Sequence, residues 1–193
     1  MSKFKSNYII TMQDIVREGD HILKRKLQDV PLPLQEEDRE ALLSMMLFLK
    51  NSQDPEMAEK YKLRGGVGLS ANQIGLDKRM FVTCFQDEKG RDQEHFIINP
   101  RIVSHSVAMI YLPQGEGCLS VDRDVEGFVP RYEKIKIRAF GLNGEPVQLT
   151  FRGYASIVMQ HEIDHLDGIM FYDRFDPSHP YRVKENMKPL EWE

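Results

Sequence analysis

The chain has 193 residues, of which 41% are hydrophobic, and this is enough for one compact domain with a core that can shape a pocket. The formal net charge of -4 argues against a general electrostatic attraction to nucleic acid or to an anionic membrane. No apolar run could cross a bilayer and no signal-peptide core follows the first lysines, so we expect a cytoplasmic protein without a membrane partner. Its two cysteines, Cys84 and Cys118, are too few for a disulfide framework and fit a reducing compartment.

The first part of the chain favours helices. Residues 11–16 can form a short helix after a capping threonine. A longer helix is predicted over residues 35–51, where leucines and methionines repeat on one face and acidic residues stand near the start. Asp54 and Pro55 are typical of an N-cap followed by proline at the first helical position, so a second short helix is predicted over residues 54–62.

The middle of the chain changes to strand-like sequence. Strands are predicted over residues 80–85, 96–100 and 133–140. The glycine-rich turn at 141–144 then predicts a hairpin with a strand over residues 147–151. Residues 133–140 alternate between an apolar and a charged face, and the charged row is interpreted as a solvated sheet face rather than a nucleic-acid site. Ile135 and Ile137 lie on the apolar face. The charged face carries Lys134, Lys136 and Arg138.

The segment 160–168 places two imidazoles and a carboxylate at helical spacing. At 3.6 residues per turn, His161 and His165 lie on one helix face, where their ring nitrogens can reach a single divalent ion. Glu162 is rotated by about 100° and is placed to act as a general base on water. Apolar residues beside this face predict a helix packed into the core, and Gly168 predicts a left-handed helix end.

A catalytic site of this kind needs a third protein ligand and leaves one position open for water. Glu185 has the spacing of a thermolysin-like third ligand, but the prolines around it disfavour the helix that would carry it. Phe171 stands where a metzincin would have its third histidine. Cys118 is the better candidate, because the glycines at 115 and 117 let the backbone come close to a ligand. Spacing alone leaves the alternative of a small buried hydrophobe equally open.

A third informative segment is the glycine-rich run at residues 65–75. It lacks the Lys-Ser/Thr pair of a phosphate loop and no clear strand precedes it, so nucleotide binding is not predicted. Its small residues suit a wall along which a substrate backbone lies, with the Gln73 amide pointing inward. A plain loop with a solvated Gln73 remains an equal alternative at this point.

These elements together predict an α+β fold with antiparallel β-sheets packed around a central metal-binding α-helix. No repeat, low-complexity tract or linker composition divides the chain. We therefore expect residues 1–193 to form a single catalytic domain.

Three segments together resemble the peptide deformylase family, whose pattern is G-x-G-x-A-A-x-Q, then E-G-C-L-S, then H-E-x-D-H. Here they stand in the same order at residues 66–73, 116–120 and 161–165, and the resemblance covers nearly the whole chain. Ser70 departs from the pattern where the family more often has alanine, a small change. The long 35–62 segment and the proline-containing tail resemble the class typical of Gram-positive bacteria, class II.

The resemblance implies a metal-dependent hydrolase that removes the N-formyl group from the N-terminal formylmethionine of newly synthesised proteins and releases formate. It implies Cys118, His161 and His165 as the ligands of one divalent metal. Fe²⁺ is expected natively, with Zn²⁺, Ni²⁺ or Co²⁺ able to substitute, since one thiolate and two imidazoles suit several of these ions.

The resemblance also implies the other roles in the site. Glu162 is expected to be the general base, and the Gln73 amide and the Leu119 backbone N–H are expected to hold the oxyanion. Arg131 is expected to pair with Glu116 behind the metal.

The methionine side chain of the substrate needs an apolar pocket, although ordinary core packing accounts for the candidate residues equally well. The expected partners are N-formylmethionyl nascent polypeptides and, transiently, the ribosome, with no nucleic-acid motif, and a monomer is expected. The candidates for the substrate site are Val67, Gly68, Gly117, Tyr154, Ile157 and Val158.

Two rival functions remain. A metalloendopeptidase would use Glu185 as its third ligand, with Cys118 inert. A non-catalytic metal module would close the site with a fourth ligand such as His105 or His179.

Overall fold

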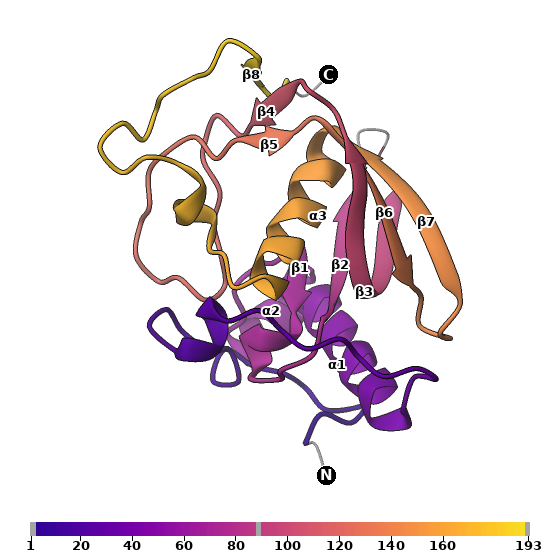
Figure 1. Cartoon of the computed structure of the whole chain (residues 1–193). Helices are drawn as coiled ribbons and strands as arrows, with labels where there is room; N and C mark the ends of the chain where they lie inside the picture. Colours follow the sequence, from indigo (N-terminus) through magenta and orange to yellow (C-terminus); the bar gives the residue numbers. More distant parts are fainter. Residues whose placement is uncertain (1–2, 88–89, 192–193) are drawn as a thin grey trace.

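The computed structural model describes residues 3–87 and 90–191 and has an α+β fold (Figure 1). The main sheet has the strand order β1-β2-β3-β6-β7, and all its neighbouring strands are antiparallel. A small second sheet has the order β5-β4-β8, in which β4 pairs with β5 antiparallel and with β8 parallel. The elements are η1 His21–Lys24, α1 Glu36–Gln53, α2 Pro55–Tyr61, β1 Gly68–Ser70, η2 Ala71–Ile74, β2 Met80–Gln86, β3 Asp92–His105, β4 Met109–Tyr111, β5 Arg131–Tyr132, β6 Lys134–Phe140, β7 Pro146–Arg152, α3 Gly153–Leu166, η3 Phe171–Arg174 and β8 Met187–Pro189.

The two long helices cover opposite faces of the main sheet (Figure 1). Helix α1 packs on the face that carries Met80 and Val82 of β2. Helix α3 packs on the other face through Val158 and Met159, against residues such as Ile137 of β6. This arrangement confirms the predicted fold class, and among the described residues the parallel β4–β8 pair is the one departure from antiparallel pairing. Within the described residues, no helix is long and apolar enough to cross a membrane.

The predicted helices over 35–51 and 54–62 are confirmed as α1 and α2. Asp54 caps α2 by accepting the backbone N–H of Met57 at 2.9 Å, and Pro55 opens the helix. The predicted helix over residues 11–16 is wrong, because residues 12–14 form a turn and the residues around them are not helical. The Asp14 carboxylate accepts the Thr11 backbone N–H at 2.9 Å, and this local bond closes a turn instead of starting a helix.

The predicted strands are confirmed, with β3 much longer than the 96–100 that the sequence indicates. A proline at position 100 favours a strand end, yet β3 continues beyond it through a β-bulge between Ile98 and Arg101. Asn99 adopts a φ of 52° at this bulge. The β6–β7 hairpin forms as expected, with Ile137 buried against α3.

Helix α3 follows β7 directly and carries both histidines of the predicted metal site. Met159, Ile163 and Leu166 are buried along it, as the apolar stripe predicts. Gly168 has a φ of 74°, which is the left-handed helix end expected from the sequence. The site helix is therefore anchored along its length by the core.

Candidate metal centre

Three side chains that are far apart in the sequence meet beside α3. His161 and His165 come from one face of the helix, and Cys118 comes from the loop between β4 and β5. One possible ligand atom from each residue lies within 4.8 Å of the others. The Cys118 Sγ lies 3.3 Å from His165 Nε2. The structure therefore brings together the three ligands proposed from the sequence.

The electrostatics of this cluster suit a divalent cation. Although burial opposes ionisation of the thiol, the imidazoles of His165 and His161 hold the pKa of Cys118 well below its usual value. The thiolate is the form that binds metal. His165 Nδ1 and Glu162 Oε2 are buried and have no hydrogen-bond partner among the described residues. The thiolate and the two imidazoles suit a metal ion, and the unpartnered Glu162 oxygen belongs to a residue that lines the same cavity and suits a water molecule beside that ion.

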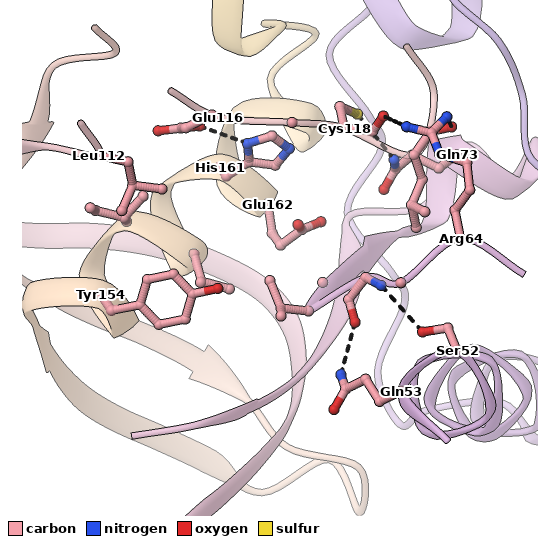
Figure 2. A pocket seen from close by; sticks show the side chains of 18 of the residues that line it. Ser52, Gln53, Arg64, Gln73, Leu112, Glu116, Cys118, Tyr154, His161 and Glu162 are labelled. Carbon is pink, nitrogen blue, oxygen red and sulfur yellow. Dashed lines mark hydrogen bonds and ion pairs between the residues drawn. The ribbon is translucent and has the colours of Figure 1, made fainter. Parts of the chain in front are cut away.

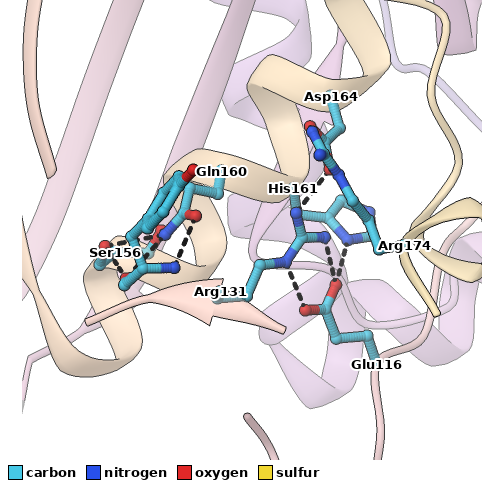
Figure 3. A network of polar contacts seen from close by, with 8 residues as sticks. Glu116, Arg131, Ser156, Gln160, His161, Asp164 and Arg174 are labelled. Atoms are coloured by element: carbon cyan, nitrogen blue, oxygen red, sulfur yellow. Dashed lines mark hydrogen bonds and ion pairs between the residues drawn. The ribbon is translucent and has the colours of Figure 1, made fainter. Parts of the chain in front are cut away.

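A buried ionic network supports His161 from behind (Figure 3). Glu116 Oε2 lies 2.9 Å from His161 Nδ1, and the same carboxylate receives two hydrogen bonds of 2.8 Å from Arg131. Arg131 is 1% exposed and also binds Asp164 at 2.5 Å, while Asp164 is bound by Arg174. Although burial opposes it, Arg131 holds the pKa of Glu116 at about 2. Glu116 is thus a permanent anion that can only accept the Nδ1–H of His161, which leaves Nε2 free to bind metal.

Glu162 lies on the side of α3 that faces β1. It is 3% exposed, and burial raises its pKa to about 7. A carboxyl group with this pKa can take up and release a proton near neutral pH. The backbone of Gly68 approaches so closely that a Cβ there would overlap the Glu162 carboxylate. The glycine at this position therefore makes room for Glu162.

The Gln73 amide is held in one orientation by its neighbours. Its Oε1 accepts the backbone N–H of Ser70 at 2.9 Å and the Ser70 hydroxyl at 3.1 Å. Its Nε2 points to Cys118 Sγ at 3.5 Å and to the Ser120 hydroxyl at 3.2 Å. Gln73 is buried, so the interpretation as a plain loop with a solvated glutamine is wrong. Ser70 orients Gln73 mainly through its backbone N–H, and the Ser70 hydroxyl lies closer to Asn72 Oδ1, at 2.8 Å.

A cavity of about 460 Å³ opens beside these groups, and Figure 2 shows its lining side chains. Glu116, Cys118, His161, Glu162 and Gln73 form its polar end. The candidates for the substrate site and the backbone donor all line this same cavity: Val67, Gly68, Gly117, Leu119, Tyr154, Ile157 and Val158.

The rival ligands do not reach the metal-binding cluster. Glu185 is exposed and lines no part of this cavity. His105 stacks on Tyr132 with ring centroids 3.7 Å apart, and His179 lies 3.2 Å from an exposed aspartate. Phe171, in the metzincin position, stacks against the His161 ring at 6.1 Å. Cys84 and Cys118 form no disulfide bond with each other.

Sequence reasoning missed several residues of the site. Leu112 lines the apolar end of the cavity, and Ser52 and Gln53 bind the N–H and the C=O of Gly66. Arg64 lies at the rim, next to Cys118 (Figure 2). These positions lie outside the three family motifs. Among them, Arg64 could have been suspected from the sequence, because it directly precedes the glycine-rich run at residues 65–75.

The chain matches the family model described as polypeptide deformylase over residues 12–181. It is 51% identical to peptide deformylase 2 of Bacillus cereus over 183 residues, which is 95% of this chain and 100% of that protein. It is also 47% identical to peptide deformylase 2 of Bacillus subtilis, with the same coverage of both chains.

Solved structures agree with this match. A peptide deformylase from Thermotoga maritima has a TM-score of 0.68 and 29% identity, covering 84% of this chain and 97% of that chain. A class I type b peptide deformylase from Acinetobacter baumannii, in a crystal structure described as Met-Ala-Ser bound, has a TM-score of 0.67 and 28% identity, covering 87% of this chain and 99% of that chain. The fold, the site and these similarities together show that the chain belongs to the peptide deformylase family.

Proposed function

We propose that the protein hydrolyses the N-formyl group of N-formylmethionyl polypeptides and releases formate, with residues 1–193 acting as one catalytic domain. The observation that carries this proposal is the buried Glu162 oxygen, which has no hydrogen-bond partner in the described part of the chain and belongs to a residue that lines the same cavity as Cys118 and His161. A base in a water-accessible cavity beside metal ligands is suited to hydrolysis.

Cys118, His161 and His165 would hold one divalent ion. When bound, this ion supplies the Lewis acidity that makes water a nucleophile near neutral pH. We propose Fe²⁺ as the native ion, with Zn²⁺, Ni²⁺ or Co²⁺ able to replace it, because this mixed ligand set accepts several ions. Metal analysis of protein purified without oxygen tests the choice, and zinc alone in that preparation would contradict it.

Glu162 moves the protons in this proposal. It accepts a proton from the attacking water and delivers it to the amine that leaves, and a pKa of about 7 suits both steps. The Gln73 amide and the Leu119 N–H stabilise the oxyanion that forms at the formyl carbon. Gln73 is supported in this role by the Ser70 backbone N–H and the Ser120 hydroxyl, which contact the two ends of its amide.

The apolar end of the cavity would receive the methionine side chain. Tyr154, Ile157 and Val158 come from successive turns of α3, and Val67 and Leu112 line the cavity with them. Gly68 and Gly117 line the same cavity and leave its walls open to a substrate backbone. Glu116 and Arg131 hold His161 in place from behind.

Formate release from formyl-Met-Ala-Ser by the metal-loaded protein tests this function. We expect release that depends on added metal and no cleavage of internal peptide bonds. Cleavage of internal bonds without formate release would favour a metalloendopeptidase instead. We further propose that the protein acts as a cytoplasmic monomer. We also propose that it meets its nascent substrates transiently at the ribosome. Co-sedimentation with translating ribosomes tests this contact.

A further inference from the structure

Two arginines outside the three motifs hold the segment that carries Cys118. Arg64, between α2 and β1, donates to the carbonyl oxygens of Cys118 and Val121, both at 3.2 Å. Arg17, in the N-terminal segment, and Arg64 both donate to the Leu119 carbonyl at 3.4 Å. The arginines thus approach this segment through its backbone carbonyls.

The contact between Arg64 and the Cys118 carbonyl bears on the direction of a backbone donor. The Cys118 carbonyl and the Leu119 N–H belong to one planar trans peptide group, so they point in opposite directions. This carbonyl accepts from Arg64 at 3.2 Å and from the Val121 N–H of its own loop at 3.1 Å, so the side chain and the loop turn hold it together. The Leu119 N–H has no hydrogen-bond partner within residues 3–87 and 90–191 and belongs to a residue that lines the cavity.

The next peptide group along the chain repeats the arrangement. Arg17 and Arg64 bind the Leu119 carbonyl, and the Ser120 N–H on the opposite edge of the same peptide donates to Cys118 Sγ at 3.4 Å. A hydrogen bond from a backbone N–H stabilises a thiolate. Orientation of this second peptide group therefore acts on the metal ligand itself.

We propose that Arg64 and Arg17 are positioning residues, with Arg64 aiming the Leu119 N–H at the oxyanion and both arginines aiming the Ser120 N–H at the Cys118 thiolate. The part that concerns the oxyanion rests on the proposed function. The part that concerns the thiolate depends only on metal binding.

The shape of the arginine side chain is essential to this role. The planar guanidinium of Arg64 reaches the carbonyls of Cys118, Leu119 and Val121 at the same time and also pairs with Asp122 at 2.8 Å. A lysine carries the same charge on a single nitrogen and cannot hold several carbonyls in one plane. The ion pair with Asp122 is exposed and contributes little by itself.

The experiment compares Arg64→Ala, Arg64→Lys and Arg17→Ala with the control Arg123→Ala. Arg123 lies in the same loop but binds Glu18 at 2.9 Å and none of these carbonyls. Cobalt(II) titration of each apoprotein, followed by the thiolate-to-cobalt absorption, measures the thiolate contact. Formate release by the metal-saturated proteins measures kcat and KM, and thermal unfolding checks the fold.

Arg64→Ala and Arg17→Ala are expected to bind cobalt about tenfold more weakly, whereas Arg123→Ala binds normally. For the saturated enzyme, Arg64→Ala is expected to lower kcat by about tenfold or more with KM within about twofold, because an oxyanion donor loses its direction. Arg64→Lys should be intermediate, and guanidinium added below denaturing concentrations should restore part of the kcat of Arg64→Ala. Arg17→Ala should lower kcat less than Arg64→Ala does.

Three results would overturn this assignment. A normal kcat and cobalt affinity in Arg64→Ala would show that the carbonyl contacts do not matter. A rise in KM alone would make Arg64 a substrate contact. If Arg123→Ala lowered the melting temperature and kcat as much as Arg64→Ala does, the effect of Arg64 would come from the stability of the loop alone. Absence of formate release by the unmodified protein would instead refute the proposed function, and the cobalt titrations would still test the thiolate contact.

Discussion

Glu116 and His161 form the link between the candidate metal centre and the buried ionic network, with 2.9 Å between Glu116 Oε2 and His161 Nδ1. The carboxylate is held by Arg131, so the imidazole has both its tautomer and its ring orientation set before any metal binds. Glu116→Gln keeps the shape but removes the negative charge. We predict zinc affinity about 10- to 100-fold weaker by competition with a chelator. The control Glu18→Gln, which removes the charge of an exposed partner of Arg123, should bind zinc normally.

Arg131 pairs with two buried carboxylates, those of Glu116 and Asp164. Arg131→Met fills the space with an apolar side chain but leaves both anions without their shared partner. We predict a loss of about 3–5 kcal/mol in the free energy of unfolding, measured by urea denaturation of the apoprotein. A loss below about 1 kcal/mol would show that the network does not stabilise the fold.

Gly68 leaves the space that the Glu162 carboxylate occupies. Gly68→Ala is therefore expected to displace the base, with kcat about 100-fold lower and metal content unchanged. Gly65→Ala is the matched control, because a Cβ there meets only the Ser52 carbonyl oxygen at 3.7 Å. Equal kcat values for the two alanine variants would contradict the assigned place of Glu162.

Substitution of Cys118 and of Glu185 distinguishes a site with Cys118 as third ligand from a thermolysin-like site with Glu185 as third ligand. Cys118→Ala removes one of the three ligands and is expected to strip the metal, while Glu185→Ala should leave it in place. Metal analysis after dialysis measures both. The reverse pattern would favour the thermolysin-like site.

His95 gives the fold a measurable pH dependence. It lies against the ring of Phe151, with centroids 5.2 Å apart, and burial lowers the pKa of His95 below its usual value. The unfolded chain therefore takes up the proton at a higher pH than the folded protein, and stability falls as the pH drops through about 6.5. His95→Phe removes this contribution, so the variant should gain stability relative to the unmodified protein between about pH 7.5 and about pH 5.5 in urea denaturation. A constant difference between the two proteins across this range would show that His95 does not titrate with folding.

Local sequence patterns predicted the longer helices and strands but missed the short strands β1, β4, β5 and β8 and the three short 3-10 helices. Helical repeats indicated α1, the Asp54–Pro55 pair indicated the start of α2, and the spacing of His161 and His165 indicated the site face of α3. The helix predicted over residues 11–16 failed because side-chain hydrogen bonds of Asp14 compete with helix formation there.

The site was predictable where a motif carries the chemistry and unpredictable where tertiary contacts do. Asn72, for example, donates to the His165 carbonyl at 2.8 Å and so ties the glycine-rich segment to the end of α3. Arg64 reaches Cys118 across 54 positions of the sequence. No local periodicity reports such contacts, because they exist only once the sheet and helices have assembled.

We propose that Glu162 is the base of a metal-dependent deformylation. Formate release from formyl-Met-Ala-Ser by the unmodified protein and by Glu162→Gln, each loaded with one nickel ion per chain, tests it most directly. We predict steady release by the unmodified protein and a rate at least about 100-fold lower for the variant, because glutamine keeps the shape but cannot accept the proton. Equal rates in the two nickel-loaded proteins would contradict the account.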